Sequence, residues 1–424
     1  MMKKIALLLG VAGVAMCPPC HRDPRTIEIV DAQRVVVFHR GGMEDLVLQS
    51  AYKGRAGDFG MILPLPDVPE IRMADAKFCD EVAKLAQERD VRKAFGEEAQ
   101  DMVRAAGKAG DIEVVKTQIA GVFEATTLKA RTVAALRDWL KSHEYRYVDD
   151  GYADKVFQSY IEKSWLFVAI KVRLEKDAAF DGSFRPMGLR FRSKDVIIPT
   201  KVASIYPAGM PFAIYVITNS AVQFPKSWGE GRVVTLPITA EQILASAPLR
   251  AELGDDAVMD RSGAMKKLAA GLDGEKREAF LSRKLSGLYL SKFAGKFSRE
   301  QLATGDLVFE RESLLEPAKV DAFVRDLSGE DFGKIRAAKR MLGAAGAGNV
   351  AAVAKHLKGA SAQTQITLAQ VLTAIGELEA VPPLIDALEK QDDALGRMAL
   401  DQALRELTGH AESDWRAWWQ KSKP

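Results

Sequence analysis

The chain of 424 residues is long enough for two or three domains, each with its own buried core. Its 60 basic and 57 acidic residues give a formal net charge of +3, so no overall field would attract nucleic acid or an anionic membrane. A hydrophobic content of 47% and a charged content of 28% are ordinary for a folded protein. These values exclude strongly basic nucleic-acid binders and leave the fold to be predicted from local patterns.

The first 16 residues have the pattern of a bacterial signal peptide. Lys3 and Lys4 form a basic start, and residues 5–16 are an apolar run of 12 residues, too short to span a bilayer. Cys17 follows in the sequence Val-Ala-Met-Cys, which resembles a lipoprotein box whose cysteine is lipidated after cleavage. Met16 stands where a small residue is usual, so ordinary cleavage after Ala15 stays open. Both alternatives predict export to the periplasm or cell envelope, and the first adds a lipid anchor.

Cys17, Cys20 and His21 spell C-x-x-C-H, which is formally a c-type haem attachment motif. In that interpretation two thioethers hold the haem and His21 is an axial ligand. We favour a disulfide, or a lipidated Cys17 beside a spare thiol, because the motif lies at the cleavage site and Pro24 breaks any helix that would present His21. Cys79 is the third cysteine and could pair with Cys20 in an oxidising compartment.

Residues 35–71 form a β-rich stretch around which the first domain is organised. Three β-prone runs are separated by glycine-containing breaks, with the runs at 35–38, 46–48 and 59–63 and the breaks at 41–42 and 53–57. Pro64, Pro66 and Pro69 follow, and we expect them to end sheet pairing because proline lacks the amide donor.

The rest of the first domain alternates strands with helices. We expect helices at 75–106 and 133–142 and a mostly helical stretch at 239–286. Strands are expected at 112–123, 166–174, 189–191, 196–199, 212–218, 288–296 and 306–311. Strand 166–174 alternates well enough to have one wet face, and Asp181-Gly182 is typical of a hairpin turn. Consecutive strands with inserted helices predict an α+β domain.

The stretch VVVFHRGGMEDLVLQSAYKGRAGDFGMILPLPDVPEI resembles the signature of a bacterial exported family, domain of unknown function 2330. Further pieces resemble that family in the same order, at residues 134–140, 160–172, 186–199 and 288–309. Together they cover roughly residues 17–312. The resemblance implies an exported protein but supplies no catalytic residues, because the family has no established activity.

From Glu316 onward the chain reads as one amphipathic helix after another. Six segments are separated by short breaks, at 320–327, 335–342, 350–357, 362–375, 381–388 and 395–407. The alternation of alanine-rich helix, glycine turn and second helix resembles HEAT-type repeats, which bury their apolar faces by stacking. Trp415, Trp418 and Trp419 are expected to cap the open end of this array, with an aromatic ligand cage as the alternative.

Motifs with recognisable chemistry are scarce. The glycines at 343–348 follow a predicted helix instead of a strand, so they fit a repeat turn and not a dinucleotide loop. The five histidines are scattered, without metal-ligand spacing. Glu44-Asp45 and Asp149-Asp150 are neighbouring carboxylates that could bind a cation, but we favour solvated turns.

We therefore predict a signal peptide at 1–16, an α+β domain at 17–312 and an all-α solenoid of HEAT-like repeats at 313–424. The predicted function is an exported, envelope-associated, non-enzymatic scaffold that binds a protein partner through its helical repeats. We expect no cofactor, no metal and no nucleic acid, and membrane contact only through a lipid anchor. The alternatives are a redox or c-type haem protein using Cys17, Cys20 and His21, or a hydrolase whose site the sequence does not reveal.

Overall fold

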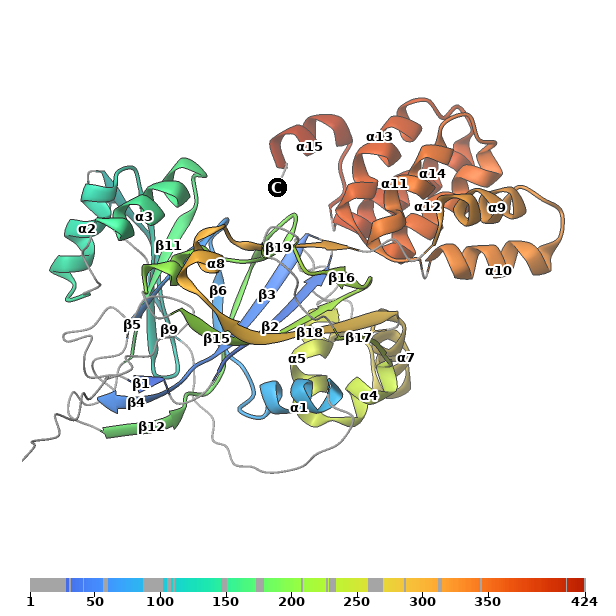
Figure 1. Ribbon diagram of the computed structural model, residues 1–424. Helices are drawn as coiled ribbons and strands as arrows, with labels where there is room; N and C mark the ends of the chain where they lie inside the picture. Colours follow the sequence, from blue (N-terminus) through green and yellow to red (C-terminus); the bar gives the residue numbers. More distant parts are fainter. Residues whose placement is uncertain are drawn as a thin grey trace, which may run out of the picture.

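The computed structural model describes residues 28–29, 32–40, 42–55, 60–86, 102–104, 108–109, 111–145, 151–172, 179–206, 209–225, 228, 234–257, 270–285, 287–311, 315–343, 345–408 and 410–422. Its N-terminal region is rich in β-sheet, whereas the regular elements described after residue 315 are all helical (Figure 1). The last strand ends at Arg311 and the next helix begins at Pro317. At this level the predicted fold class is confirmed.

The largest sheet has seven strands in the order β17-β18-β15-β2-β3-β13-β6. Their bounds are β17 Val234–Ile238, β18 Leu288–Phe297, β15 Met210–Thr218, β2 Gln33–Arg40, β3 Met43–Gln49, β13 Met187–Arg192 and β6 Glu70–Met73. β2 and β15 pair in parallel, and the other pairs are antiparallel. Val35 and Val37 of β2 enter one core, while Val36 and Phe38 enter the core on the opposite face. The apolar run at 35–38 is thus explained by burial on both faces of the sheet.

A second sheet has six strands, with the order β5-β11-β10-β9-β7 and β8 also paired to β9. The bounds are β5 Gly60–Leu65, β11 Leu166–Val172, β10 Phe123–Ala130, β9 Ile112–Ala120, β7 Met102–Arg104 and β8 Lys108–Ala109. Pro64 lies inside β5 opposite Phe167, so our expectation that Pro64 ends sheet pairing is wrong. A proline fits there because β5 is at the end of the strand order, where one side needs no donor. The wet face expected for 166–174 is also wrong, since Lys171 alone is not fully buried within β11.

The remaining described strands form two three-stranded sheets. One has the order β1-β4-β12 and the other β14-β19-β16, with bounds β1 Glu28–Ile29, β4 Ala51–Arg55, β12 Ala179–Ser183, β14 Val196–Ile198, β19 Leu307–Arg311 and β16 Val222–Gln223. Asp181 and Gly182 lie in β12 opposite Lys53 and Tyr52 of β4. The hairpin turn predicted at 181–182 is therefore wrong, and the break predicted at 53–57 is wrong for the residues up to Arg55, which are strand. Pairing between distant segments overrides the local turn preference of glycine at both places.

Helices of the N-terminal region cover the sheets. The bounds are α1 Phe78–Leu85, α2 Val133–Ser142, α3 Tyr152–Glu162, α4 Ala240–Ala245, α5 Ala247–Ala257, α7 Gly274–Lys284 and α8 Arg299–Ala303, with a 3-10 helix η3 at Lys201–Ile205. Residues of α1, α4, α5 and α7 share a core with one face of the seven-stranded sheet (Figure 1). The single helix expected at 75–106 is wrong at its end, because residues 102–104 form β7. The helix predicted at 133–142 is confirmed, and Thr132 caps it by accepting a hydrogen bond from the amide of Ala135.

The C-terminal helices surround a core of their own. They are α9 Pro317–Leu327, α10 Phe332–Gly343, α11 Val350–Ala354, α12 Ala362–Ile375, α13 Val381–Glu389, α14 Ala394–Thr408 and α15 Trp415–Ser422, with 3-10 turns η5 Ala347–Asn349, η6 Lys355–Leu357 and η7 Leu378–Ala380. α9 packs on α10, α13 packs on α14, and α12 contacts both α10 and α14. The glycines at 343–348 connect α10 to α11, as expected for a turn. No helix in the described parts of the chain has the length and apolar character needed to cross a bilayer.

Candidate functional site

Most of the residues that the sequence singled out for chemistry cannot be placed. Cys17, Cys20, His21 and Asp149-Asp150 lie outside the described residues. Cys79 lies in α1 as a fully buried free thiol, and burial raises its pKa to about 12. A thiol of this kind is unreactive at neutral pH. Its pairing with Cys20 stays a prediction.

Glu44 and Asp45 do not form a solvated turn. Both lie in β3 and both are fully buried. Adjacent residues of a strand point to opposite faces, so the two carboxylates do not face one site. Glu44 accepts a hydrogen bond from the amide of Ile197 at 3.0 Å, and burial raises its pKa well above the ordinary value. Among the described residues no group of three or more His, Cys, Asp or Glu could hold a metal ion.

Asp45 belongs to a buried ion-pair cluster that joins three strands to a helix. Its Oδ2 accepts hydrogen bonds from Nη2 of Arg190 at 2.8 Å and from Nη2 of Arg72 at 2.5 Å. Arg72 also pairs with Glu252 of α5, which accepts the amide of Asp75 at 2.7 Å. The cluster holds β3, β6 and β13 against α5, so we assign it a role in stability.

A second buried cluster joins the β-sheet region to the C-terminal helices, and we call it the junction: His39, Arg40, Asn219, Arg311 and Glu377. Arg311, at the end of β19, donates from Nη2 to Nδ1 of His39 at 2.6 Å and from Nη1 to Oε2 of Glu377 at 2.7 Å. His39 comes from β2, whereas Glu377 directly follows the C-cap of α12. One guanidinium therefore links a central strand to a C-terminal helix.

The hydrogen bonds of His39 fix its tautomer. Nε2 lies 2.9 Å from the carbonyl oxygen of Ser193, so Nε2 carries the proton, and Nδ1 is the acceptor for Arg311. Burial, helped by the positive charge of Arg311, lowers the pKa of His39 to about 3. His39 is therefore a neutral acceptor at physiological pH.

Glu377 and Arg311 are perturbed by the same surroundings. Burial raises the pKa of Glu377 and outweighs the opposing effect of the Arg311 charge. Burial alone would lower the pKa of Arg311, but the carboxylates of Glu377 and Glu379 raise it above its ordinary value. Arg311 stays charged, and removing it would leave Glu377 buried without its cation.

The C-terminal end of α12 completes the junction. Asn219 donates from Nδ2 to the carbonyl oxygen of Ile375 at 2.7 Å, which satisfies a carbonyl that the helix itself leaves free. Gly376 caps the helix with φ +81°, and an added Cβ there would lie 3.5 Å from the guanidinium of Arg40. Arg40 and Arg311 thus face the negative end of the α12 dipole. The junction has the geometry of a specific contact that holds the two regions together.

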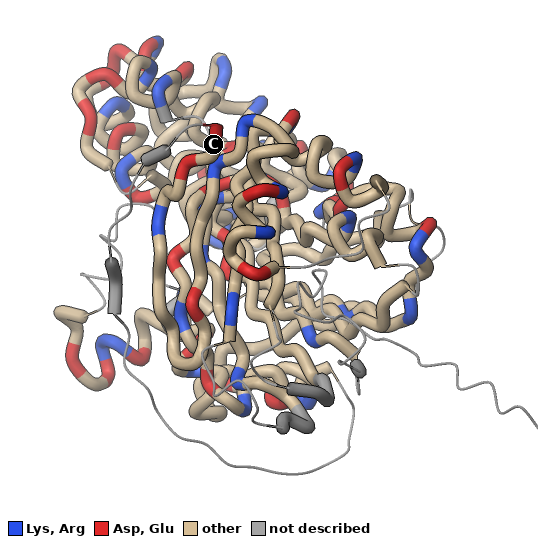
Figure 2. The backbone as a smooth tube through the Cα atoms, turned by 90° about the vertical axis from the view of Figure 1, so that its left-hand side faces the viewer, with Lys and Arg blue, Asp and Glu red and all other residues tan. Residues whose placement is uncertain are grey.

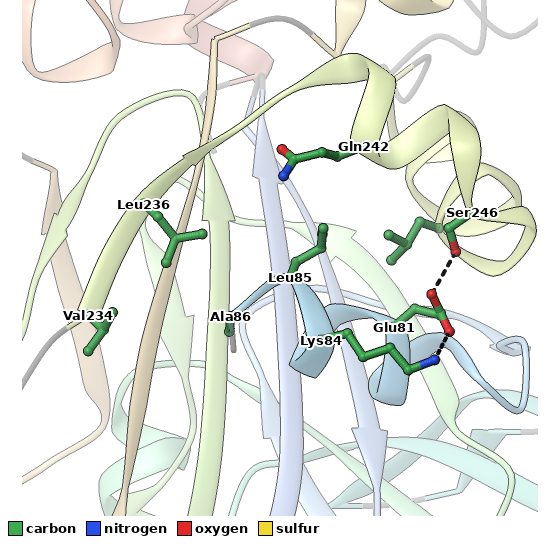
Figure 3. Close-up of a pocket in the computed structure, with 9 residues that line it drawn as sticks. Glu81, Lys84, Leu85, Ala86, Val234, Leu236, Gln242 and Ser246 are labelled. Atoms are coloured by element: carbon green, nitrogen blue, oxygen red, sulfur yellow. Dashed lines mark hydrogen bonds and ion pairs between the residues drawn. The ribbon is translucent and has the colours of Figure 1, made fainter. Parts of the chain in front are cut away.

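A pocket of about 680 Å³ lies between α1, β17, α4 and α5. Its lining is Glu81, Lys84, Leu85, Ala86, Val234, Leu236, Gln242, Ser246 and Leu249. Glu81 lies between Lys84 and Ser246, and its carboxylate pairs with Lys84 and accepts the hydroxyl of Ser246 at 3.1 Å (Figure 3). The volume would suit a small molecule. The strongly perturbed groups His39, Glu44 and Glu377 are not part of this lining.

Exposed apolar side chains concentrate on the C-terminal helices. Of the six large hydrophobic side chains exposed in the described part of the chain, four lie on α10 and α14. Phe332 is 85% exposed, Met398 65%, Leu395 63% and Met341 40%. Sequence periodicity gave no signal for them: Phe332 lies before the helix predicted at 335–342, and Leu395 and Met398 lie within the helix predicted at 395–407. No other described residue covers these four side chains to the extent of burying them.

The C-terminal tryptophans pack against the helical core. Trp415 is buried and donates from Nε1 to Asp401 of α14 at 2.7 Å, and its ring meets Trp418 edge-on. Trp418 and Trp419 are partly buried against the same core. The rings therefore contact one another and the helical core, and their capping of a repeat array stays a prediction.

Residues 11–284, which run from before β1 to the end of α7, match the family model described as an uncharacterized protein conserved in bacteria, DUF2330. The chain belongs to the DUF2330 family. No curated protein matches the chain, and no solved structure matches it. The match ends at Lys284, so in this DUF2330 protein α9–α15 and two of the five junction residues, Arg311 and Glu377, lie outside the matched region.

Proposed function

We propose that this DUF2330 protein is exported to the bacterial envelope, where it binds a protein partner through its C-terminal helices and catalyses no reaction. The observation that carries the proposal is the exposure of Phe332, Leu395 and Met398 on α10 and α14. Four of the six exposed large apolar side chains of the described residues lie on these two helices, and a concentration of this kind is characteristic of a binding site. Export rests on the signal-peptide pattern of residues 1–16.

A HEAT-like arrangement of these helices is supported by their contacts. α9–α10 and α13–α14 pack as pairs, α11 contacts α9 and α12, and α12 lies between α10 and α14. This gives one layer of α9, α11 and α13 and a second layer of α10, α12 and α14. We call the outer side of the second layer the α10–α14 face. Stacked helix pairs expose extended faces of this kind, and repeat proteins use them for binding.

The junction gives the N-terminal region a role in the proposed scaffold. Asn219 and Arg311 hold the end of α12 at the sheets, and α12 is the middle helix of the α10–α14 face. The face is thereby presented in a fixed orientation to the rest of the protein. After cleavage of the signal peptide, the mature chain is either anchored to the membrane through a lipidated Cys17 or soluble in the periplasm.

The test is site-specific photocrosslinking in the producing bacterium, with the photoreactive residue at Met398 of the full chain. We expect one discrete crosslinked protein, whose yield falls when Leu395 is replaced by Ser. The matched control is Val308 of β19, which is 39% exposed and lies away from this face. Equal crosslinking from Met398 and Val308, or no product from Met398, would contradict the proposal.

A further inference from the structure

We infer that the partner contributes an acidic segment, which lies over α10 and places an apolar side chain against Leu395 and Met398 of α14. This inference rests on the proposed function and specifies the chemistry of the partner. It is carried by the charges of α10, which are a separate observation from the exposed apolar side chains.

Among the described C-terminal helices, α10 has the largest excess of basic over acidic residues. Lys334, Arg336, Lys339 and Arg340 are all exposed, and the helix contains no acidic residue. Lys339 donates to the side chain of Gln370 on α12. Within the described residues, the other three make no ion pair.

The neighbouring helices α9 and α14 carry acidic residues beside their cations, and several cations of the C-terminal region outside α10 are paired. Arg405 pairs with Asp401 at 2.6 Å, Lys355 with Asp321 at 2.9 Å, and Arg416 with both Asp386 and Glu389. Figure 2 shows acidic and basic residues interspersed along the chain, so the run of cations on α10 is a local exception. Unpaired exposed cations beside apolar side chains are complementary to a ligand that carries carboxylates.

The spacing of the helices sets the length of the segment. α12 separates α10 from α14, and packed helices have axes about 8–10 Å apart, so α10 and α14 are about 16–20 Å apart. An extended chain advances about 3.3 Å per residue, so about six residues span this distance. The exposed side chains of α12 between them, Gln363, Gln370 and Ala374, are polar or small and leave room for such a segment.

A protein segment fits these residues better than an anionic membrane does. Asp392 and Asp393 are exposed immediately before α14, and Glu406 is exposed later on that helix. A planar anionic surface that met α10 and α14 together would meet these carboxylates as well, at a cost from like-charge repulsion. A single segment can place its carboxylates over α10 alone.

The experiment measures binding of a fluorescein-labelled peptide to the full chain by anisotropy. The peptide carries a run of Glu followed, about six residues later, by Leu and Phe. Two control peptides carry Lys in place of Glu, or Ser in place of Leu and Phe. We expect binding of the first peptide alone, weakening as the ionic strength rises to about 0.15 M, where the Debye length is about 8 Å.

Charge reversal on the protein tests the position of the segment. We expect R336E/R340E to weaken binding of the acidic peptide about tenfold, equivalent to about 1.4 kcal/mol. The matched control is K319E/R325E, which makes the same change at exposed positions of α9 and should leave binding unchanged. All four positions are exposed, so the variants should fold, and circular dichroism with thermal unfolding verifies this.

Three outcomes would overturn the inference. They are failure of the acidic peptide to bind, equal effects of the α9 and α10 variants, and a preference for phosphatidylglycerol vesicles that R336E/R340E abolishes. If Met398 still crosslinks to a discrete protein in cells, the proposed function survives any of these results. If the crosslink fails while the acidic peptide binds as expected, the proposed function fails and the charge preference of α10 stands.

Discussion

The fold lowers the pKa of His39 strongly. We therefore expect the free energy of unfolding to depend on pH through this residue. Its pKa is about 3 in the folded protein and about 6.5 in an unfolded chain. The unfolded chain therefore binds an extra proton between these values, so the stabilising contribution is complete above about pH 6.5 and is lost as the pH falls toward 3. The largest slope that one such group can give is about 1.4 kcal/mol per pH unit.

The measurement is the free energy of unfolding of wild type and H39Q between about pH 4 and pH 7, the window set by the two pKa values. We expect the wild type to lose stability more steeply than H39Q as the pH falls. Glu44 acts in the opposite direction, because its pKa is raised in the folded protein and stability is therefore lost as the pH rises above the ordinary pKa of a glutamate. This effect is the same in both proteins, since both contain Glu44. Parallel pH profiles would show that His39 is not held neutral.

Lipidation of Cys17 is a prediction, and intact mass spectrometry of the membrane and soluble fractions tests it directly. A chain that begins at Cys17 and carries a diacylglyceryl and an acyl group would establish the lipid anchor and exclude a thioether at that cysteine. An unmodified soluble chain two hydrogens lighter than its sequence would instead give a periplasmic disulfide protein. A haem mass with visible absorbance would overturn both and establish the haem alternative.

At the scale of elements, the pairing of β15 with β18 depends on a close backbone approach at Gly209. Its φ is +68°, and a Cβ would lie 2.2 Å from the carbonyl oxygen of Phe297. G209A should therefore cost clearly more than the roughly 1–2 kcal/mol of a left-handed backbone alone. Gly287 is the matched control, because its φ is +74° and no atom lies within 4 Å of its Cβ position. Equal losses of unfolding free energy in G209A and G287A would contradict this account.

The elements also show where sequence patterns were sufficient. The helices at 133–142 and 362–375 were predicted at their observed bounds, because apolar periodicity is a local signal. In the structure the side chains of Thr132 and Ser361 cap them, which is also a local interaction. The strands at 51–55 and 179–183 were missed, because each is strand only through its partner. Glycines in both segments favoured turns when read alone.

For the whole molecule, Arg311 is the strongest test of how the two regions are joined. R311M leaves the buried Glu377 without its cation, and breaking a buried pair in this way costs about 3–5 kcal/mol. The expected result is a large loss of unfolding free energy in chemical denaturation. E377M should restore part of the loss in R311M/E377M, since it removes the unpaired carboxylate.

R416M provides the control for Arg311. Arg416 joins α15 to α13 through an ion pair with Glu389 at 2.6 Å, but it is solvent exposed, so we expect little change in stability. A loss in R416M as large as that in R311M would mean that burial does not set the strength of the junction.

The sequence by itself determined the family, the β-rich beginning and the helical end, because each depends on short-range pattern or composition. Only the tertiary structure decided that Glu44 and Asp45 are buried on opposite faces, and that His39, Arg311 and Glu377 meet. These three residues are separated by 272 and 66 positions, and no local periodicity encodes a contact between a strand and a distant helix cap. The α10–α14 face was likewise decided by packing, because a side chain is exposed or buried according to what its neighbours cover.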